Sequence, residues 1–152
     1  MNPMPHPEPA PELVWSDALL LGFAPMDATH RDFVDCVRRL RQATPDTAAV
    51  CLHAMLRHTQ EHFEEERRWM DETGFPATQC HVDEHEAVLG SLHEVTELLR
   101  SGAKVELVHS LADTLANWFP GHADYMDAAL SHWMCKRTFG GAPLVLRRGA
   151  GR

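Results

Sequence analysis

The stretch "TGFPA", residues 73–77, marks the point where one long helix ends and another begins. Gly74 follows a long run without Gly or Pro, and a glycine there ends a helix because it adopts the left-handed conformation that other residues avoid. Pro76 cannot continue the helix, since it lacks the backbone N–H. We therefore predict a helix that ends at Gly74 and another that starts near Ala77, with a connection short enough to make them antiparallel.

Stop signals of the same kind recur on both sides of this connection. "ATPDT", residues 43–47, separates a first helix from the second, with Thr44 as the predicted cap and Pro45 in the first turn, where a missing N–H matters least. "SGAK", residues 101–104, separates the third from the fourth. We predict helices from Pro25 and Asp27 to about Ala43, from Pro45 to Gly74, from Ala77 to "SGAK", and from Val105 onward. These helices predict an all-α fold, an antiparallel up-down-up-down four-helix bundle.

The two ends of the chain are predicted to lie outside the bundle. Residues 1–12 alternate with proline and predict an extended arm, disordered or laid on the surface. Residues 136–152 are rich in glycine and finish with basic residues, so we expect a tail. The bundle would then occupy residues 13–135, with "LVWSDALLLGFAPM", residues 13–26, packed across one of its ends.

The composition predicts one soluble domain. At 152 residues the chain suits a single core, and no apolar run reaches the ~20 residues that span a bilayer. The formal charge of -8 argues against nucleic acid, an anionic membrane or an acidic substrate as the main partner. The four cysteines form no CxxC pair and no signal-peptide pattern opens the chain, which predicts a cytoplasmic protein. We expect a monomer.

Histidine is the outlier in this composition, with eleven residues against a single tyrosine. His62 and Glu66, like His81 and His85, are four residues apart, which is about 40° around a helix and therefore one face. The first and last helices add three more polar residues, and in an up-down-up-down bundle all of them converge on one layer. The full set is His30, His62, Glu66, His81, His85, His122 and Asp127.

Five imidazoles and two carboxylates are more than the four ligands of one zinc ion, but they suit two metals with bridging carboxylates. The many nitrogen donors favour iron, copper or zinc over magnesium or calcium. Each pair alone is more often a solvated helix pair, and a lone buried histidine is more often hydrogen-bonded. Burying the whole set without metal would cost several kcal/mol, so the joint pattern indicates a two-metal site.

The other histidines are predicted to lie outside this layer. His58, one turn before His62, is a candidate hydrogen-bonding partner of the site. His6 belongs to the arm. Surface or boundary positions are expected for His53, His93, His109 and His132.

The spacing of His122 and Asp127 conflicts with a regular helix. Residues five apart point about 140° away from each other, which two ligands of one site cannot easily do. The stretch "WFPGHADYMDAAL", residues 118–130, also contains Pro120, which lacks an N–H, and Gly121, which relaxes the backbone. We predict a kink or a single π-type turn that brings positions i and i+5 together.

These motifs resemble the hemerythrins, in particular the single-domain bacteriohemerythrins. The resemblance extends from about Trp15 to Trp133 and rests on "MDATHRDF", "HFEEERRWM", "GFP" followed by "HVDEH", and "WFPGHADYMD". It implies a non-haem diiron centre. One iron would be held by His81, His85 and His122 and the other by His30 and His62, with Glu66, Asp127 and an oxo or hydroxo group bridging both.

The resemblance further implies reversible O2 binding at the open position of the two-histidine iron, for carriage, storage, delivery or sensing, and no enzymatic activity. It implies an apolar pocket lined by Phe63, Trp118, Phe119 and Ala123. Ala123 stands where a larger aliphatic residue is common, so we expect a more open pocket. An open pocket would also suit a diiron enzyme that acts on peroxide or nitric oxide, or in iron repair. A zinc-loaded helical module is the third alternative, and the protein client is unknown.

Overall fold

The computed structural model describes residues 12–141 and residue 145. Within them every regular element is a helix, and no strand is present. The predicted all-α class is therefore confirmed. The elements are the 3-10 turn η1 (Asp17–Leu19), α1 (Ala24–Arg41), α2 (Ala48–Thr73), α3 (Thr78–Arg100), α4 (Val105–His122), the π-helical turn η2 (Ala123–Asp127) and α5 (Ala128–Phe139).

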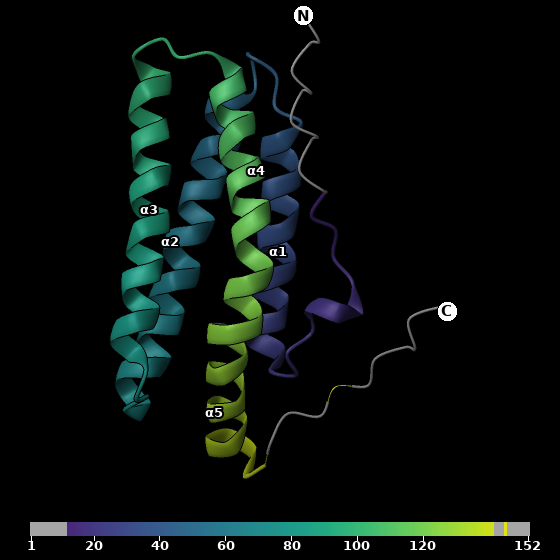
Figure 1. Cartoon of the computed structure of the whole chain (residues 1–152), viewed down its shortest axis with the longest axis vertical. Helices are drawn as coiled ribbons and strands as arrows, with labels where there is room; N and C mark the ends of the chain where they lie inside the picture. Colours follow the sequence, from purple (N-terminus) through teal and green to yellow (C-terminus); the bar gives the residue numbers. More distant parts are fainter. Residues whose placement is uncertain (1–11, 142–144, 146–152) are drawn as a thin grey trace, which may run out of the picture.

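The helices form the predicted antiparallel four-helix bundle (Figure 1). α1 packs against α2 and α4, and α3 packs against the same two helices. α4, η2 and α5 follow one another without interruption and together make the fourth helix of the bundle. None of the helices in residues 12–141 combines the length and the apolar character that a membrane crossing requires.

Most predicted helix ends lie within a few residues of the observed ones. Gly74 caps α2 with a left-handed φ of 67°, and the N–H of Phe75 donates to the carbonyl of Met70 at 3.0 Å. The predicted start of α2 at Pro45 is wrong. The N–H of Thr44 donates to Oγ1 of Thr47 at 2.9 Å, so the two threonines hold a separate turn around Pro45, and the helix begins only at Ala48.

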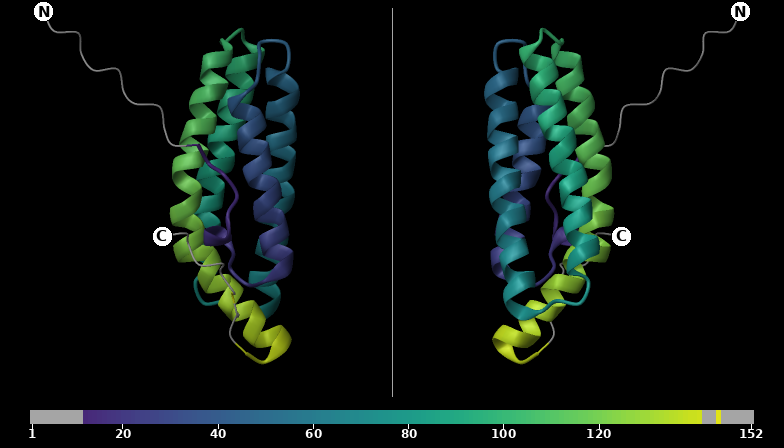
Figure 2. Two further views of the ribbon diagram at one scale, coloured as in Figure 1. Left: turned by 90° about the vertical axis from the view of Figure 1, so that its right-hand side faces the viewer. Right: turned by 90° about the vertical axis from the view of Figure 1, so that its left-hand side faces the viewer.

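The segment before α1 runs lengthwise along the bundle, beside α1 and α4, and does not cross its end as predicted (Figure 2). Arg31 of α1 covers the ring of Trp15, with its guanidinium carbon 5.1 Å from the ring centroid. Further along, the N–H groups of Leu21 and Gly22 donate to the carboxylate of Asp27 at 2.8 and 3.0 Å. These contacts fasten the segment to the side of α1.

The predicted ends of the chain are only partly described. Residues 1–11 of the expected arm and residues 142–144 and 146–152 of the expected tail lie outside the described residues. α5 continues to Phe139 before Gly140 caps it with a φ of 76°, so residues 136–139 belong to the last helix and not to the tail.

The core consists of two apolar clusters separated by a polar layer. The upper cluster in Figure 1 contains Phe33, Phe63, Val88 and Ala123, and it continues to the far end of the bundle. The lower cluster contains Met26, Met70, Val82, Leu130 and further residues. In each helix of the bundle one buried polar residue falls between a member of the upper cluster and a member of the lower one, which fixes the height of the layer: His30 in α1, Glu66 in α2, His85 in α3 and Asp127 in the fourth helix.

Candidate metal centre

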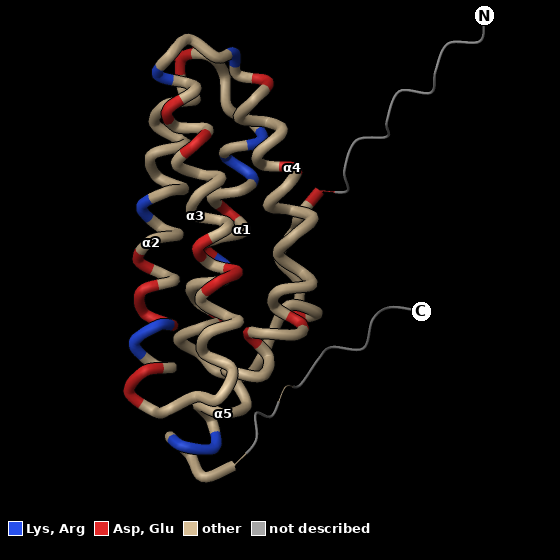
Figure 3. Tube along the Cα trace, turned by 60° about the vertical axis from the view of Figure 1, so that its left-hand side comes forward, with Lys and Arg blue, Asp and Glu red and all other residues tan. Residues whose placement is uncertain are grey.

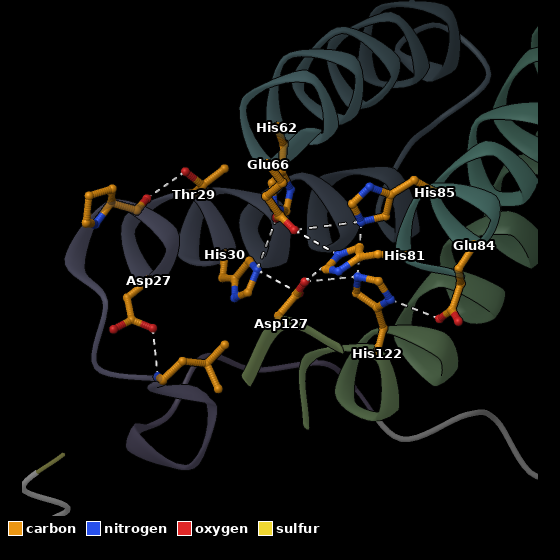
Figure 4. A network of polar contacts seen from close by, with 12 residues as sticks. Asp27, Thr29, His30, His62, Glu66, His81, Glu84, His85, His122 and Asp127 are labelled. Carbon is orange, nitrogen blue, oxygen red and sulfur yellow. Dashed lines mark hydrogen bonds and ion pairs between the residues drawn. The ribbon is translucent and has the colours of Figure 1, made fainter. Parts of the chain in front are cut away.

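The structure brings all seven candidate ligands together in this polar layer (Figure 4). Every one of them is buried, with at most 5% of its surface exposed. α1 contributes one residue, α2 and α3 two each, and the end of α4 with η2 the last two. They are His30, His62, Glu66, His81, His85, His122 and Asp127.

A π-helical turn places the last two of these residues side by side. η2 starts directly after His122, and the N–H of Ala128 donates to the carbonyl of Ala123, five residues earlier. Nε2 of His122 consequently lies 3.1 Å from Oδ1 of Asp127. The predicted π-type turn is confirmed. Gly121 serves no close approach there, because a Cβ at this position would meet open space.

The two oxygens of Glu66 face different groups of histidines. Oε1 lies 3.1 Å from Nε2 of His81 and 3.8 Å from Nε2 of His85. Oε2 contacts Nε2 of His62 and lies 4.0 Å from Nε2 of His30. Each oxygen of the Glu66 carboxylate therefore faces its own pair of histidines.

The two oxygens of Asp127 also face different groups of histidines. Its Oδ1 lies 3.1 Å from Nε2 of both His81 and His122, whereas its Oδ2 lies 3.0 Å from Nε2 of His30. The layer thus contains a group of three histidines and a group of two, and each carboxylate presents one oxygen to either group.

Most of these polar atoms are buried without a hydrogen-bond partner among the described residues. They include both ring nitrogens of His30, His62 and His81 and both oxygens of Glu66 and of Asp127. Buried polar atoms are normally hydrogen-bonded, so this many unpaired ones in one place require another explanation. Nitrogen and oxygen atoms that crowd together without bonding to each other fit ligands that point at common metal positions.

The carboxylates strongly shift the protonation of their neighbours. Burial disfavours charge on His81, but the close carboxylates of Asp127 and Glu66 outweigh it and raise the pKa of His81 to about 9. Burial also opposes charge on Asp127, yet His122, His30 and His81 hold the pKa of Asp127 well below its usual range. His85 behaves oppositely: burial, helped by His81 and His122, lowers its pKa to about 3.

These shifts predict how the stability of the chelator-treated protein depends on pH. His81 has a higher pKa folded than unfolded, so its contribution is complete below pH 6.5 and disappears as the pH rises to about 9. His85 has a lower pKa folded than unfolded, so stability falls as the pH decreases from about 6.5 towards 3. We expect a maximum of unfolding free energy near pH 6.5, with each of the two histidines contributing a slope of at most about 1.4 kcal/mol per pH unit.

Urea unfolding between pH 4 and 9.5 in the presence of a chelator measures this curve. The alkaline slope should be smaller in His81→Asn, where His62, whose pKa Glu66 also raises against burial, accounts for the remainder, and the exposed His93→Asn should keep the full slope. A wild-type curve that is flat between pH 6.5 and 9 would contradict the prediction.

Aromatic rings surround the histidines on the side of the upper cluster. Phe63 stacks on His85 with ring centroids 3.6 Å apart and planes 2° apart, and Phe119 meets His30 edge to face at 5.1 Å. The ring of Trp118 stacks on that of His122 at 4.4 Å. Ala123 is 1% exposed and belongs to the same cluster as the two phenylalanines.

Sequence reasoning missed two residues of this site. Phe33 stacks on Phe119 at 4.8 Å and meets His62 at 6.4 Å. Its position three residues after His30 was the available signal. Glu84 accepts a hydrogen bond from Nδ1 of His122 at 2.9 Å. No spacing rule indicates Glu84, because it lies off the core face of α3.

The histidines outside the layer lie largely as predicted. His58 packs near His62, with ring centroids 5.9 Å apart, but its buried Nε2 has no hydrogen-bond partner among the described residues, so the predicted hydrogen bond to the site is not formed. Nε2 of the half-buried His109 donates to the carbonyl of Ala43 at 2.7 Å. His53, His93 and His132 are exposed.

Comparisons with known proteins agree with this site. The family model described as "Hemerythrin HHE cation binding domain" matches residues 21–133. The chain is 35% identical over 127 residues to a bacteriohemerythrin of Ralstonia nicotianae, covering 84% of this chain and 92% of that protein. It is 28% identical over 141 residues to a bacteriohemerythrin of Stenotrophomonas maltophilia, covering 85% and 91%.

Solved structures support the fold independently. Two crystal structures of hemerythrin mutants superpose on the chain with a TM-score of 0.68 at 18% identity, covering 76% of this chain and 91% of each of theirs. The family match spans most of the bundle and includes all seven residues of the polar layer. The chain belongs to the hemerythrin family.

Proposed function

We propose that the polar layer holds two iron ions and that the protein binds O2 reversibly, as an O2 carrier, store, delivery protein or sensor. The observation that carries this proposal is the division of the two carboxylates, each of which presents one oxygen to either histidine group. A single metal ion would leave one oxygen of each carboxylate and one histidine group unused. Two ions use every donor of the layer.

The donors fit iron. In this proposal His81, His85 and His122 hold one ion, His30 and His62 hold the other, and Glu66 and Asp127 bridge them. Imidazole and carboxylate suit iron, whereas magnesium and calcium prefer oxygen donors alone. When bound, the pair of ions would supply two electrons together, and the side with fewer histidines offers fewer protein ligands. The unpaired buried atoms of both groups support the same assignment.

The surrounding side chains would keep this site dry. Phe119 and Phe33 cover the two-histidine group, and Phe63 and Trp118 lie against the three-histidine group. Because apolar rings offer water no hydrogen bonds, they retard its entry and favour a small apolar ligand such as O2. In this proposal Phe63, Trp118, Phe119 and Ala123 form the O2 pocket, with Phe33 added by the structure.

The spectrum of the reduced protein tests the proposal. Protein loaded with iron under nitrogen should bind two iron ions per chain, gain a visible absorption band on exposure to O2, and lose it when O2 is removed. Immediate conversion to the oxidised spectrum would favour the diiron enzyme instead. Binding of zinc with no affinity for iron would refute the proposal.

One observation favours the enzymatic alternative. A cavity of about 430 Å³ opens between α2 and α3, and its lining includes Phe63 and His85. His85, a residue of the site, thus borders a space from which a small molecule such as hydrogen peroxide or nitric oxide could approach. Consumption of hydrogen peroxide or nitric oxide by the reduced iron-loaded protein would support this alternative. In the absence of such turnover we assign no enzymatic activity.

Ala123→Leu is expected to slow autoxidation severalfold, because a larger side chain beside Phe119 would restrict access of water to the site. Since Ala123 is already buried, the extra atoms should also reduce stability by about 1–3 kcal/mol. The decay of the O2-dependent absorption and a thermal melt measure the two effects. Ala129→Leu, on the exposed side of α5, is the matched control. An unchanged or faster decay in Ala123→Leu would count against a role of residue 123 in access.

The surface charges and the cysteines bear on the partners and the location that we propose for the protein. Basic and acidic side chains are interspersed along α2, so the helix offers no continuous basic face for a nucleic acid (Figure 3). All four cysteines are free, which is consistent with the cytoplasmic location expected from the sequence. We expect the protein to act as a monomer, and its melting temperature and sedimentation at two concentrations would test this.

A further inference from the structure

Glu84 connects the polar layer with the surface of the bundle. Its Oε1 accepts one hydrogen bond from Nδ1 of His122 and another from the indole Nε1 of Trp118, each at 2.9 Å. The Glu84 side chain is 33% exposed, whereas that of His122 is 2% exposed. Glu84 and Trp118 also line a surface cavity of about 440 Å³ between α3 and α4. A half-exposed carboxylate thus reaches a histidine of the buried site.

The contact selects one tautomer of His122. A carboxylate only accepts hydrogen bonds, so Nδ1 of His122 carries the proton that it donates to Glu84, and Nε2 is the nitrogen left for a metal. Nε2 is the atom that points into the layer, 3.1 Å from Oδ1 of Asp127 (Figure 4). Trp118 limits rotation of the same ring, because it stacks on the imidazole at an angle of 27° while its own N–H is held by Glu84. Both contacts keep the ring in the orientation in which Nε2 can donate to a metal.

His122 differs in this respect from other histidines of the layer. Nδ1 of His30, His62 and His81 is buried without a hydrogen-bond partner among the described residues. These three rings are oriented by packing and by their Nε2 contacts alone. His122 also follows Pro120 and Gly121 and immediately precedes the π-helical turn, where the backbone is least regular. A hydrogen bond from a residue outside the polar layer is therefore most useful at His122.

We infer that Glu84 is a positioning residue that, together with Trp118, holds His122 in the metal-donating tautomer and orientation. The inference rests on the proposed metal-binding function and adds to it a residue from outside the ligand set. A carboxylate that accepts from the distal nitrogen of a ligating histidine also makes the ring a stronger donor. Loss of such a partner typically weakens metal binding about 10- to 100-fold. Glu84 should therefore control how long metal stays bound.

Release of Co²⁺ to excess chelator, followed by the cobalt absorption in the visible range, tests this role without O2. Glu84→Ala should release the metal about 10- to 100-fold faster than wild type. Glu84→Gln should lie between them, because an amide oxygen still accepts from His122 but without the charge that strengthens the bond. Asp83→Asn removes one charge from the exposed neighbouring position and should match wild type.

Two further measurements separate positioning from general stability. Long-range ¹H–¹⁵N spectra of the chelator-treated protein should show a proton on Nδ1 of His122 in wild type and partial loss of that proton in Glu84→Ala. Trp118→Phe should release metal faster than wild type but keep the tautomer, since Glu84 remains. Melting of the chelator-treated Glu84→Ala protein should stay close to wild type.

The outcomes distinguish this inference from the proposed function. A wild-type protein that takes up no Co²⁺ or iron would refute the metal site itself. A wild-type protein that binds metal, with equal release rates and an unchanged tautomer in Glu84→Ala, would overturn only the role of Glu84. Faster release that is accompanied by an equally large loss of stability without metal would also overturn it, because Glu84 would then be a structural residue.

Discussion

Asp127→Ala and Glu66→Ala are each expected to reduce the iron content from two ions per chain to less than one. Both carboxylates are completely buried, and each faces both histidine groups, so the loss of either one would remove a ligand from both proposed metal positions at once. The thermal stability gained from metal should be lost as well. Binding at a concentration 1,000-fold above the dissociation constant stabilises a protein by about 4 kcal/mol, and this is the size of the effect we expect.

Iron content after gel filtration and thermal melts with and without chelator measure both effects. Glu64→Ala and Asp124→Ala are the matched controls, because these carboxylates lie on the same elements but are exposed. Chelator should lower the melting temperature of wild type and of both controls but leave that of the two test variants unchanged. Full iron content in either test variant would refute a bridging role for that carboxylate.

Adding one residue to the π-helical turn should affect metal binding as strongly as the loss of a carboxylate. Removing one residue from the turn should instead leave metal binding intact. Insertion of Ala after Tyr125 places His122 and Asp127 six residues apart, about 240° around a regular helix, and a single π turn absorbs one extra residue but not two. We expect this protein to bind no metal pair. Deletion of Tyr125 leaves the two ligands four residues apart, about 40° on a regular helix, and should preserve metal binding.

Tyr125 suits this experiment because 83% of its surface is exposed, so its removal costs little packing. Circular dichroism would show that both proteins remain helical, and iron analysis would report the site. Tyr125→Ala controls for the side chain. If deletion abolished metal binding as completely as insertion, metal binding would require the π-helical turn itself. Placing His122 and Asp127 on one face of the helix would then not be enough.

Much of this architecture follows from local sequence signals. Gly74 with Pro76 ends one helix and separates it from the next, because their backbone requirements hold in any tertiary context. The four-residue spacing of His62 and Glu66 places both on one face for the same local reason. Even the π-helical turn was predictable, because a regular helix cannot bring His122 and Asp127 together.

The features that were missed depend on contacts between helices. Glu84 lies beside the core face of α3, and its hydrogen bonds to Trp118 and His122 exist only because α4 packs against that edge. The course of the segment around Trp15 depends on contacts with α1, such as that of Arg31 with the Trp15 ring, which no local pattern describes. The predicted start of α2 was wrong because Thr44 and Thr47 bond to each other in a separate turn. The presence of a capping residue at Thr44 does not indicate this bond.

In the proposed two-metal site, the shared carboxylates would also determine how the two metal positions fill. An ion that enters one histidine group fixes one oxygen of Glu66 and one of Asp127, and the remaining oxygens are then already aimed at the other group. A second ion would therefore meet a preorganised half-site, and we expect it to bind more tightly than the first, which is positive cooperativity. When iron is scarce, the population should divide into empty and fully loaded chains, with few that carry a single ion.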